Sequence, residues 1–326
     1  MNLNFYFLTY EFNINIDEQT GVKVQKFWKG FLKKDLRFNI EKKWTIEFHR
    51  GEPKTIIDYD NNILWHYHKS VCDLTEFNNF FRETIVKLSA IDGVLWLHCS
   101  SFNLNNKTYL VIGKKGFGKT TLLLNTLNKC KATFISNDQL PVFIYQGAAY
   151  CLCWRPDIKI SLINDKKMLY LVNQNIPYSF IDYRKMSDRL KKEIVPATIN
   201  LSINVVPNEI FKVDEIIVLS NEQKIKSFND NFINYVIDDL ETILPFKLEN
   251  ISKYIPYWNK RIVKINMSEC ANRVVENCIN TLNIQCSKYF VGNRLDFDLV
   301  RDEILLEDGK DEWLLYKSDF LYWKKL

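Results

Sequence analysis

Residues 113–120 of this 326-residue chain, Gly113-Lys114-Lys115-Gly116-Phe117-Gly118-Lys119-Thr120, fit the pattern G-x-x-x-x-G-K-[ST]. Glycines allow such a loop to curl so that successive backbone N–H groups converge on phosphate oxygens. The lysine of the pattern reaches the β- and γ-phosphates, and the hydroxyl that follows it ligates Mg²⁺. The segment therefore predicts a nucleotide-binding loop, in which Lys119 supplies the charge and Thr120 binds the metal.

The scarcity of glycine in the chain strengthens this prediction. Only 10 residues are glycine, whereas the usual share of roughly 7% would give about twenty-three. Gly113, Gly116 and Gly118 nevertheless fall within one short segment. A residue that the chain uses sparingly is concentrated where a backbone would meet phosphate.

Two elements must position this loop. An apolar run enters Gly113, and leucines at helical spacing follow Thr120, so we expect a strand before the loop and a helix from Thr120 to about Lys129. The helix would bury Leu123, Leu124 and Leu127. Its N-terminus would add free N–H groups and a favourable dipole to the phosphate site.

The strand before the loop is predicted to be half of a hairpin. Runs 94–104 and 107–112 flank Asn105-Asn106, which tolerate the left-handed turn conformation. A two-residue turn makes paired positions sum to 211, which places Gly113 opposite His98. His98 is then expected beside the loop, in reach of a phosphate or an incoming hydroxyl, although a single histidine on a strand is more often structural.

A short buried strand at 132–136 is predicted to end at Asn137-Asp138. Asp138 lies nineteen positions after Lys119, which leaves room for one short helix between the loop and the acidic strand end. This spacing favours a compact kinase core over a large motor domain. The N-K-x-D pattern that reads guanine in small GTPases does not occur in the sequence.

These three segments, in this order, resemble the HPr kinase/phosphorylase superfamily. The resemblance is carried by His98-Cys99-Ser100-Ser101, by the loop at 113–120 and by Ile135-Ser136-Asn137-Asp138, and it covers about residues 90–165. It implies an α/β fold with a P-loop kinase core like that of phosphoenolpyruvate carboxykinase. It also implies transfer of a phosphoryl group from ATP to a hydroxyl, typically of serine.

The sequence departs from the family pattern at several points. The acidic pair of the family is Asn137-Asp138 here, and the Glu that often follows the hydroxyl residue of the loop is Thr121. No arginine- and glycine-rich segment marks a bifunctional enzyme. The resemblance is therefore to divergent relatives that phosphorylate peptides or small molecules. Asp138 is left with two open roles, as base toward the hydroxyl and as a Mg²⁺ ligand.

The predicted site combines these residues. Its catalytic residues are Asp138, His98 and Lys119, its metal ligands are Thr120 and Asp138, and its nucleotide-binding residues are Gly113, Lys114, Lys115, Gly116, Phe117, Gly118, Lys119, Thr120 and Thr121. Phosphoryl transfer needs further positive charge, because negative charge spreads over the transferring oxygens. One arginine among Arg155, Arg184 and Arg189 is expected to supply it.

The remaining elements suggest two regions. Region 1–90 is expected to be β-rich with one helix: strands near Phe5–Tyr10, Trp44–Phe48 and Ile63–Tyr67 precede a helix that Asp73 or Thr75 caps and that runs to about Ile91. Region 91–326 is expected to be the nucleotide-binding domain, because strands at 158–162, 215–219 and 261–265 alternate with helices at 229–244 and 269–282.

Composition excludes several other functions. The net charge of +5 and the pI of 8.6 are low for a nucleic-acid-binding domain. The eight cysteines lack zinc-site spacing and are expected to be reduced and buried, and His66-x-His68 could form a metal pair but lacks a third ligand. No signal peptide and no apolar run of about 18 residues occurs. We expect a cytoplasmic protein without membrane or nucleic-acid partners, and its oligomeric state is left open.

The leading hypothesis is an ATP- and Mg²⁺-dependent kinase whose acceptor is a hydroxyl of a protein, a peptide or a small molecule. The alternative is a nucleotide-binding ATPase or switch module without an acceptor, which the neutral Asn137 keeps open. A scaffold with a vestigial loop is the third, weaker hypothesis. The sequence does not identify the acceptor, and the preference for adenine over guanine comes from the resemblance alone.

Overall fold

The computed structural model describes residues 1–69, 72, 74–113, 117–130, 132–137, 139–154, 158–161, 191–194, 209–219, 226–228, 278–286 and 289–292. These residues form a mixed α/β structure with several sheets. They divide into two compact units, one made of the described residues of Met1–Val94 and the other of those from Leu95 onward. The strand predicted at 261–265, the helix at 229–244 and most of the helix at 269–282 lie outside the described residues.

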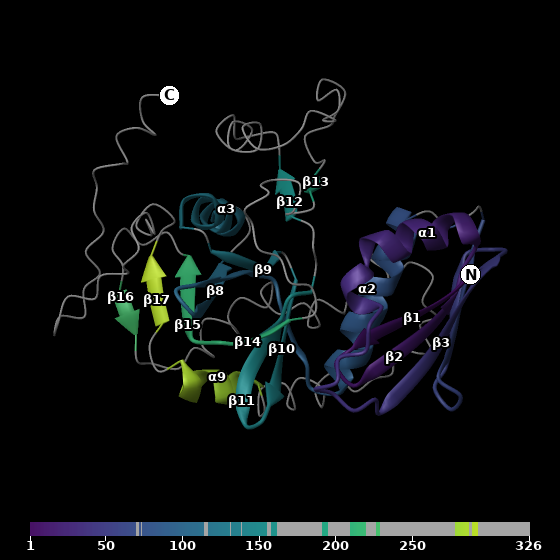
Figure 1. The fold of residues 1–326 in the computed structure, drawn as a ribbon, viewed down its shortest axis with the longest axis horizontal. Helices are drawn as coiled ribbons and strands as arrows, with labels where there is room; N and C mark the ends of the chain where they lie inside the picture. The colour runs from purple at the N-terminus through teal and green to yellow at the C-terminus, as the bar shows by residue number, and fades with distance from the viewer. Residues whose placement is uncertain are drawn as a thin grey trace, which may run out of the picture. The chain divides into compact units, whose positions relative to one another are not determined.

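The first unit is a five-stranded sheet with two helices on one face (Figure 1). The strand order is β1-β2-β3-β5-β4, with antiparallel pairs at the two edges and parallel pairs in the centre. The bounds are β1 Asn2–Phe7, β2 Tyr10–Asn15, α1 Glu18–Phe27, β3 Lys42–Arg50, β4 Lys54–Asp58, β5 Ile63–His68 and α2 Leu74–Ile91, with a 3-10 turn η1 at Lys29–Phe31.

Aromatic side chains fill the space between α2 and this sheet. Phe81 lies edge-on to Phe5, Phe12 and Trp28, with ring centroids 4.9 to 5.6 Å apart. Such pairs add to the stabilisation that burial of their large apolar surface supplies. The inward stripe of α2 consists of residues at three- and four-residue spacing that are all buried: Phe77, Phe80, Phe81, Ile85 and Leu88.

Two local predictions for this unit are wrong. The region contains two α-helices rather than the one expected, since α1 precedes α2. Asp17 caps α1 by accepting a 2.9 Å hydrogen bond from the backbone N–H of Thr20. The apolar stripe of α1 is short and interrupted by Gly21, so periodicity alone does not reveal it. The strand expected at Phe5–Tyr10 is also split into β1 and β2, which are joined by a turn in which Leu8 has φ of 51°.

His66 and His68 lie on the buried face of β5. The ring of His66 stacks on Phe80 with centroids 4.0 Å apart, and its Nδ1 is 3.0 Å from the hydroxyl of Thr55. The two imidazoles are 6.2 Å apart. Both histidines are buried and are therefore part of the core. Among the described residues, no group of three or more His, Cys, Asp or Glu that could hold a metal occurs.

The second unit is built on a six-stranded sheet in the order β16-β17-β15-β8-β7-β9 and a four-stranded sheet in the order β14-β11-β10-β6, with the hairpin β12-β13 beside them (Figure 1). The bounds are β6 Leu95–Leu97, β7 Ser100–Leu104, β8 Lys107–Gly113, α3 Lys119–Cys130, β9 Thr133–Asn137, β10 Leu140–Tyr145, β11 Ala148–Leu152, β12 Ile158–Ser161, β13 Lys191–Ile194, β14 Ile210–Lys212, β15 Glu215–Leu219, β16 Lys226–Phe228, α9 Asn280–Gln285 and β17 Tyr289–Gly292.

The predicted hairpin register is confirmed over its described ladder. Strands β7 and β8 pair from Ser100 opposite Val111 to Leu104 opposite Lys107, so paired positions sum to 211. Asn105 and Asn106 have φ of 52° and 62°, the conformation that a tight two-residue hairpin turn requires. The strand at 215–219 and the helix after the loop are also confirmed within one residue at their described ends.

The register prediction fails at the site end of the hairpin. The run 94–104 is not one strand: β6 pairs with β10 in the other sheet, and the ladder of β7 starts at Ser100. His98 and Cys99 therefore connect two sheets, and Gly113 pairs with Leu219 of β15 rather than with His98. The chain passes from the four-stranded sheet to the six-stranded sheet at a point that the apolar pattern of the sequence does not mark.

Two chemical expectations can be examined in the described part of the chain. The cysteines at 72, 99, 151, 153, 278 and 286 are free and buried, as predicted. Burial raises the pKa of the Cys151 thiol to about 12, so this thiol stays protonated at neutral pH.

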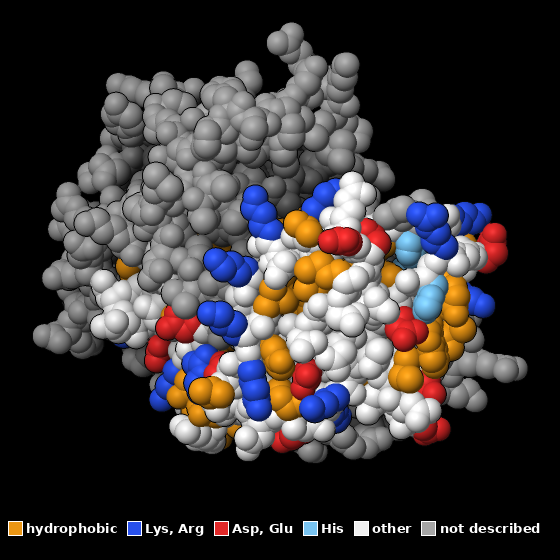
Figure 2. Space-filling model, turned by 45° about the vertical axis from the view of Figure 1, so that its right-hand side comes forward, with side chains coloured by type: hydrophobic (Ala, Val, Ile, Leu, Met, Phe, Trp, Pro, Cys, Tyr) orange, Lys and Arg blue, Asp and Glu red, His pale blue; other side chains and the backbone are white. Residues whose placement is uncertain are grey.

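No described helix is both long enough and apolar enough to cross a bilayer. On the face shown in Figure 2, basic, acidic and hydrophobic side chains are interspersed.

His66 predicts a pH dependence of stability for the first unit. Burial, reinforced by the nearby His68, lowers the pKa of His66 from 6.5 to about 4. Between these values the unfolded chain binds a proton that the folded chain does not, so the free energy of unfolding decreases as the pH falls from 6.5 to 4. Chemical denaturation across this range should show a smaller loss for His66→Gln than for the wild type.

The exposed His49 provides the matched control. We expect His49→Gln to follow the wild-type pH profile. Equal pH profiles for the wild type and His66→Gln would contradict the assignment.

Candidate functional site

The loop begins at Gly113, the last residue of β8, where the neighbouring strand β15 leaves no room for a side chain. Gly113 pairs in parallel with Leu219 and has φ of +148°, and a Cβ on Gly113 would lie 2.7 Å from the carbonyl oxygen of Leu219. Real Cβ contacts are longer than this, and side chains rarely adopt such a φ. Only glycine fits here, so the first residue of the predicted loop is required by the packing of the sheet.

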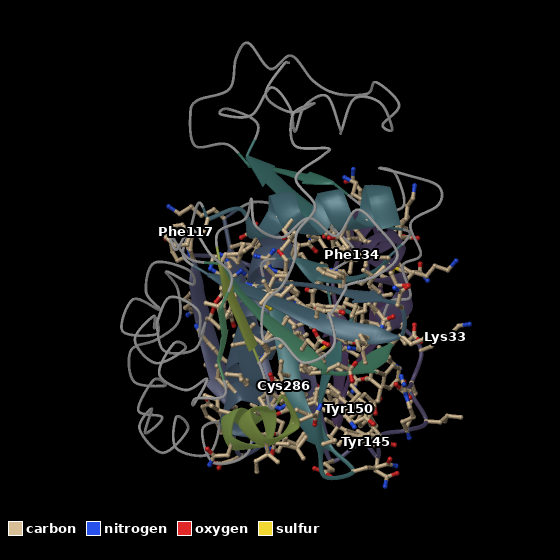
Figure 3. All side chains as sticks on the ribbon, turned by 90° about the vertical axis from the view of Figure 1, so that its left-hand side faces the viewer. Lys33, Phe117, Phe134, Tyr145, Tyr150 and Cys286 are labelled. Carbon is tan, nitrogen blue, oxygen red and sulfur yellow. The ribbon has the colours of Figure 1, made fainter. Side chains whose placement is uncertain are left out.

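The loop ends at the first turn of α3. Gly118 has φ of +98°, and its carbonyl accepts a 2.9 Å hydrogen bond from the backbone N–H of Leu122. Glycine adopts this positive φ at little cost, whereas an L side chain would strain it. The backbone thereby turns from the loop into the helix, and the N-terminus of α3 faces the end of the loop. Figure 3 shows Phe117 at the same end of the unit as α3, with Tyr145 and Tyr150 at the opposite end.

Lys119 joins the two ends of the loop. Its side chain is buried, and its ammonium group donates a 2.5 Å hydrogen bond to the carbonyl of Gly113. The ammonium is therefore held at the mouth of the loop rather than in solvent. A cation in this place, next to the positive end of the α3 dipole, makes the loop attractive to an anion.

Thr120 lies next to a buried polar group that the sequence prediction did not include in the site. Asn137, which is the last residue of β9 and 1% exposed, accepts hydrogen bonds through Oδ1 from two hydroxyls. One is Oγ1 of Thr120 at 3.1 Å, and the other is Oγ of Ser100 at 2.9 Å. Ser100 is the first residue of β7 and pairs directly with Asn137 in the sheet.

The structure thus brings together Gly113, Gly118, Lys119 and Thr120 and adds Ser100 and Asn137. Both added residues stand in the segments that carry the family resemblance. The signal available for Asn137 is its place at the end of the apolar run 132–136, whereas Ser100 falls inside the expected run 94–104 and has no such signal. Their contact with Thr120 depends on how three elements pack, which local patterns do not reveal.

Other predicted site residues are less fully placed. His98, half-buried, lies in the connection between β6 and β7, two residues before Ser100. Thr121 belongs to the first turn of α3, and its side chain is not described. The following lie outside the described residues: Lys114, Lys115, Gly116, Asp138, Arg155, Arg184 and Arg189. Position 138 is bracketed by Asn137 and by Gln139, whose carbonyl accepts a 2.5 Å hydrogen bond from the hydroxyl of Ser136.

The described residues fit a nucleotide phosphate. The loop and the start of α3 supply backbone turned by glycine, a buried ammonium and a helix N-terminus. The end of β9 adds the buried amide nitrogen of Asn137, which has no hydrogen-bond partner among the described atoms. Mg²⁺ would find one ligand in this part of the chain, the hydroxyl of Thr120. Such a metal takes its remaining ligands from phosphates, from water and from one or two carboxylates.

Comparisons with known proteins add little. No family model and no curated protein matches the chain. Among solved structures, the Hpr(Ser) kinase/phosphatase from Coxiella burnetii is similar over 39% of this chain and 65% of that chain, with 16% sequence identity and a TM-score of 0.27. The similarity thus spans just under two thirds of the length of that neighbour. A likeness this weak carries no conclusion about activity.

The close approach at Gly113 predicts a specific cost for an added methyl group. Gly113→Ala must relieve both the positive φ and the clash with Leu219, whereas Gly147→Ala, at φ of +77° with nothing within 4 Å of its Cβ, carries only the conformational cost. We expect Gly147→Ala to lower the free energy of unfolding by about 1 kcal/mol. Gly113→Ala should cost about 1–3 kcal/mol more.

Urea denaturation of both variants and of the wild type measures this difference. Equal destabilisation by the two alanines would show that β8 and β15 can separate at no cost, and that the glycine is not required by packing.

Proposed function

We propose that this chain is a kinase similar to HPr kinases, which binds ATP with Mg²⁺ at the loop of residues 113–120 and transfers the γ-phosphoryl group to a hydroxyl. The observation that supports this most directly is the joint placement of Lys119 and Thr120. The former donates to Gly113 at the mouth of the loop, and the latter contacts Asn137 at the end of β9. A strand, a glycine loop and a helix N-terminus in this order form the context that the motif requires.

The proposed reaction is an in-line displacement. The acceptor oxygen forms a bond to the γ-phosphorus while the bond from that phosphorus to the β–γ bridging oxygen breaks, and ADP leaves with the electron pair. Lys119 would interact with the β- and γ-phosphates and stabilise charge that develops on the transferring group. In this proposal Asp138 accepts the hydroxyl proton, and His98 positions the phosphate or the acceptor.

Mg²⁺, when bound, would neutralise part of the negative charge of the phosphates. Thr120 and Asp138 are the residues proposed to hold it. The loop N–H groups and the N-terminus of α3 would orient the phosphates and exclude water from one side of them. One arginine among Arg155, Arg184 and Arg189 is proposed to add positive charge.

A nucleotide-dependent switch without an acceptor is the second candidate. The neutral side chain of Asn137 favours it, since this residue contacts Thr120 at a position where a carboxylate would strengthen metal binding. Slow ATP turnover with intact ATP affinity and no labelled acceptor would support the switch over the kinase.

Lys119 provides the test of the kinase proposal. We expect Lys119→Ala to lower ATP affinity and to abolish transfer, since its ammonium would contact the phosphates. Lys107→Ala is the matched control, because Lys107 starts β8, the strand that leads into the loop, and forms an exposed 2.7 Å ion pair with Glu215. Calorimetric titration with ATP measures binding. Mass spectrometry of a cell lysate incubated with the protein, ATP and Mg²⁺ detects phosphorylated acceptors.

Asp138→Asn separates binding from chemistry. If Asp138 is the base, this variant should bind ATP but transfer no phosphoryl group. Undiminished transfer by Asp138→Asn would remove Asp138 from that role. Unchanged ATP affinity in Lys119→Ala would contradict the placement of the phosphates.

A further inference from the structure

Asn137 is more deeply buried and more tightly bonded than a surface strand end requires. It is 1% exposed, and its Oδ1 accepts hydrogen bonds from Ser100 and Thr120 at 2.9 and 3.1 Å. Its Nδ2 is also buried and has no hydrogen-bond partner among the described atoms. Leaving such a donor unpaired is costly, so an unpaired amide nitrogen inside a folded unit calls for a partner.

The sheet holds this amide in place. Ser100 pairs with Asn137 on one side and with Val111 of β8 on the other, so the hydroxyl of Ser100 and the amide are positioned by the same ladder. The third member, Thr120, is on the first turn of α3. The three side chains therefore connect β7, β9 and the end of the loop, and the amide has little freedom to rotate while both hydroxyls donate to its oxygen.

We infer that Asn137 is a positioning residue of the nucleotide site, whose amide oxygen orients the hydroxyls of Thr120 and Ser100 and whose amide N–H donates to a phosphate oxygen of the bound nucleotide. This inference rests on the proposed nucleotide site. When the proton of the Thr120 hydroxyl is directed to Asn137, the lone pairs of Thr120 are left for a metal ion. The amide nitrogen then supplies the site with a neutral donor that suits an anion.

Charge distinguishes an amide from a carboxylate at this position. Aspartate could accept from the same two hydroxyls, but it would replace the donor by a negative oxygen beside the phosphates. That oxygen would repel a nucleotide without metal and attract Mg²⁺. The opposite amide orientation of Asn137, with oxygen toward the ligand, would likewise oppose a phosphate. Asparagine with its oxygen toward the two hydroxyls therefore lets the chain hold phosphate with less dependence on the metal.

The dependence of ADP binding on Mg²⁺ tests this inference. Calorimetry gives the Kd of ADP in EDTA and in excess Mg²⁺. The ratio of the Kd in EDTA to the Kd in Mg²⁺ measures how strongly binding depends on the metal. For Asn137→Asp we expect this ratio to exceed the wild-type ratio by at least about tenfold, the effect of one hydrogen bond to a charged group. Most of the increase should come from weaker binding in EDTA.

Asn103→Asp is the matched control for the added charge. Asn103 is on β7, the strand that pairs with β9, and it too contacts a threonine hydroxyl, that of Thr108 at 3.0 Å, but it lies at the turn end of the hairpin. Its ratio should equal that of the wild type. An equal rise in both aspartate variants would attribute the effect to general charge and overturn the inference.

Ser100→Ala and Ser101→Ala form a second pair that adds no charge. Both serines are buried neighbours on β7, but the hydroxyl of Ser101 donates to the carbonyl of Tyr109 rather than to Asn137. We expect Ser100→Ala to weaken ADP binding in EDTA about threefold or more, and Ser101→Ala to leave it unchanged. Thermal unfolding monitors the integrity of all four variants, and this pair decides the question if Asn137→Asp does not fold.

The outcomes separate the two proposals. A wild-type protein that binds ADP in neither buffer overturns the nucleotide site and the role of Asn137 together. A wild-type protein that binds ADP, with an unchanged ratio in Asn137→Asp, overturns the role of Asn137 alone. Equal ADP affinities of Ser100→Ala and Ser101→Ala would likewise reduce Asn137 to a structural residue.

Discussion

The close approach of β8 and β15 at Gly113 is the constraint on which the rest of the second unit depends. Because a Cβ at this position would lie 2.7 Å from the carbonyl oxygen of Leu219, the strand must end in glycine. The carbonyl of Gly113 is then placed where the ammonium of Lys119 bonds to it. A packing requirement between two strands thereby sets the start of the loop and the position of its charge.

The polar side chains around the loop share one arrangement. A cation and a helix N-terminus face the end of the loop, and the residue that contacts Thr120 is a neutral amide that two hydroxyls hold. The described part of the site thus combines the ammonium of Lys119 with the neutral amide that contacts Thr120. A cation next to a helix N-terminus favours an anionic ligand.

Local chemistry accounts for the parts of the fold that could be predicted from sequence. The Asn105-Asn106 turn determines the hairpin register, and the helix expected between a cap at Asp73 or Thr75 and about Ile91 is α2. Helix α1 does not follow from the sequence pattern, because its apolar stripe is short. Its start is defined instead by the side chain of Asp17, which accepts a hydrogen bond from the backbone N–H of Thr20. The break at His98 and the contact of Thr120 with Asn137 arise from the pairing of distant segments, about which a local pattern carries no information. For the same reason, the sequence pattern places Gly113 opposite His98, whereas in the structure it pairs with Leu219.

The pairing of β8 with β15 also has a consequence for the order of folding. Lys107 forms an ion pair with Glu215 across a sequence separation of 108 residues, and the backbone N–H of Thr108 bonds to Asp214 across 106. Long-range pairing of this kind forms slowly, because a long loop must close first. On the ribosome, the hairpin of β7 and β8 is synthesised well before its parallel partner. The start of the loop at Gly113 can therefore take its final place in the sheet only after residue 219 has emerged, which makes the completion of this edge of the sheet a late event for the nascent chain.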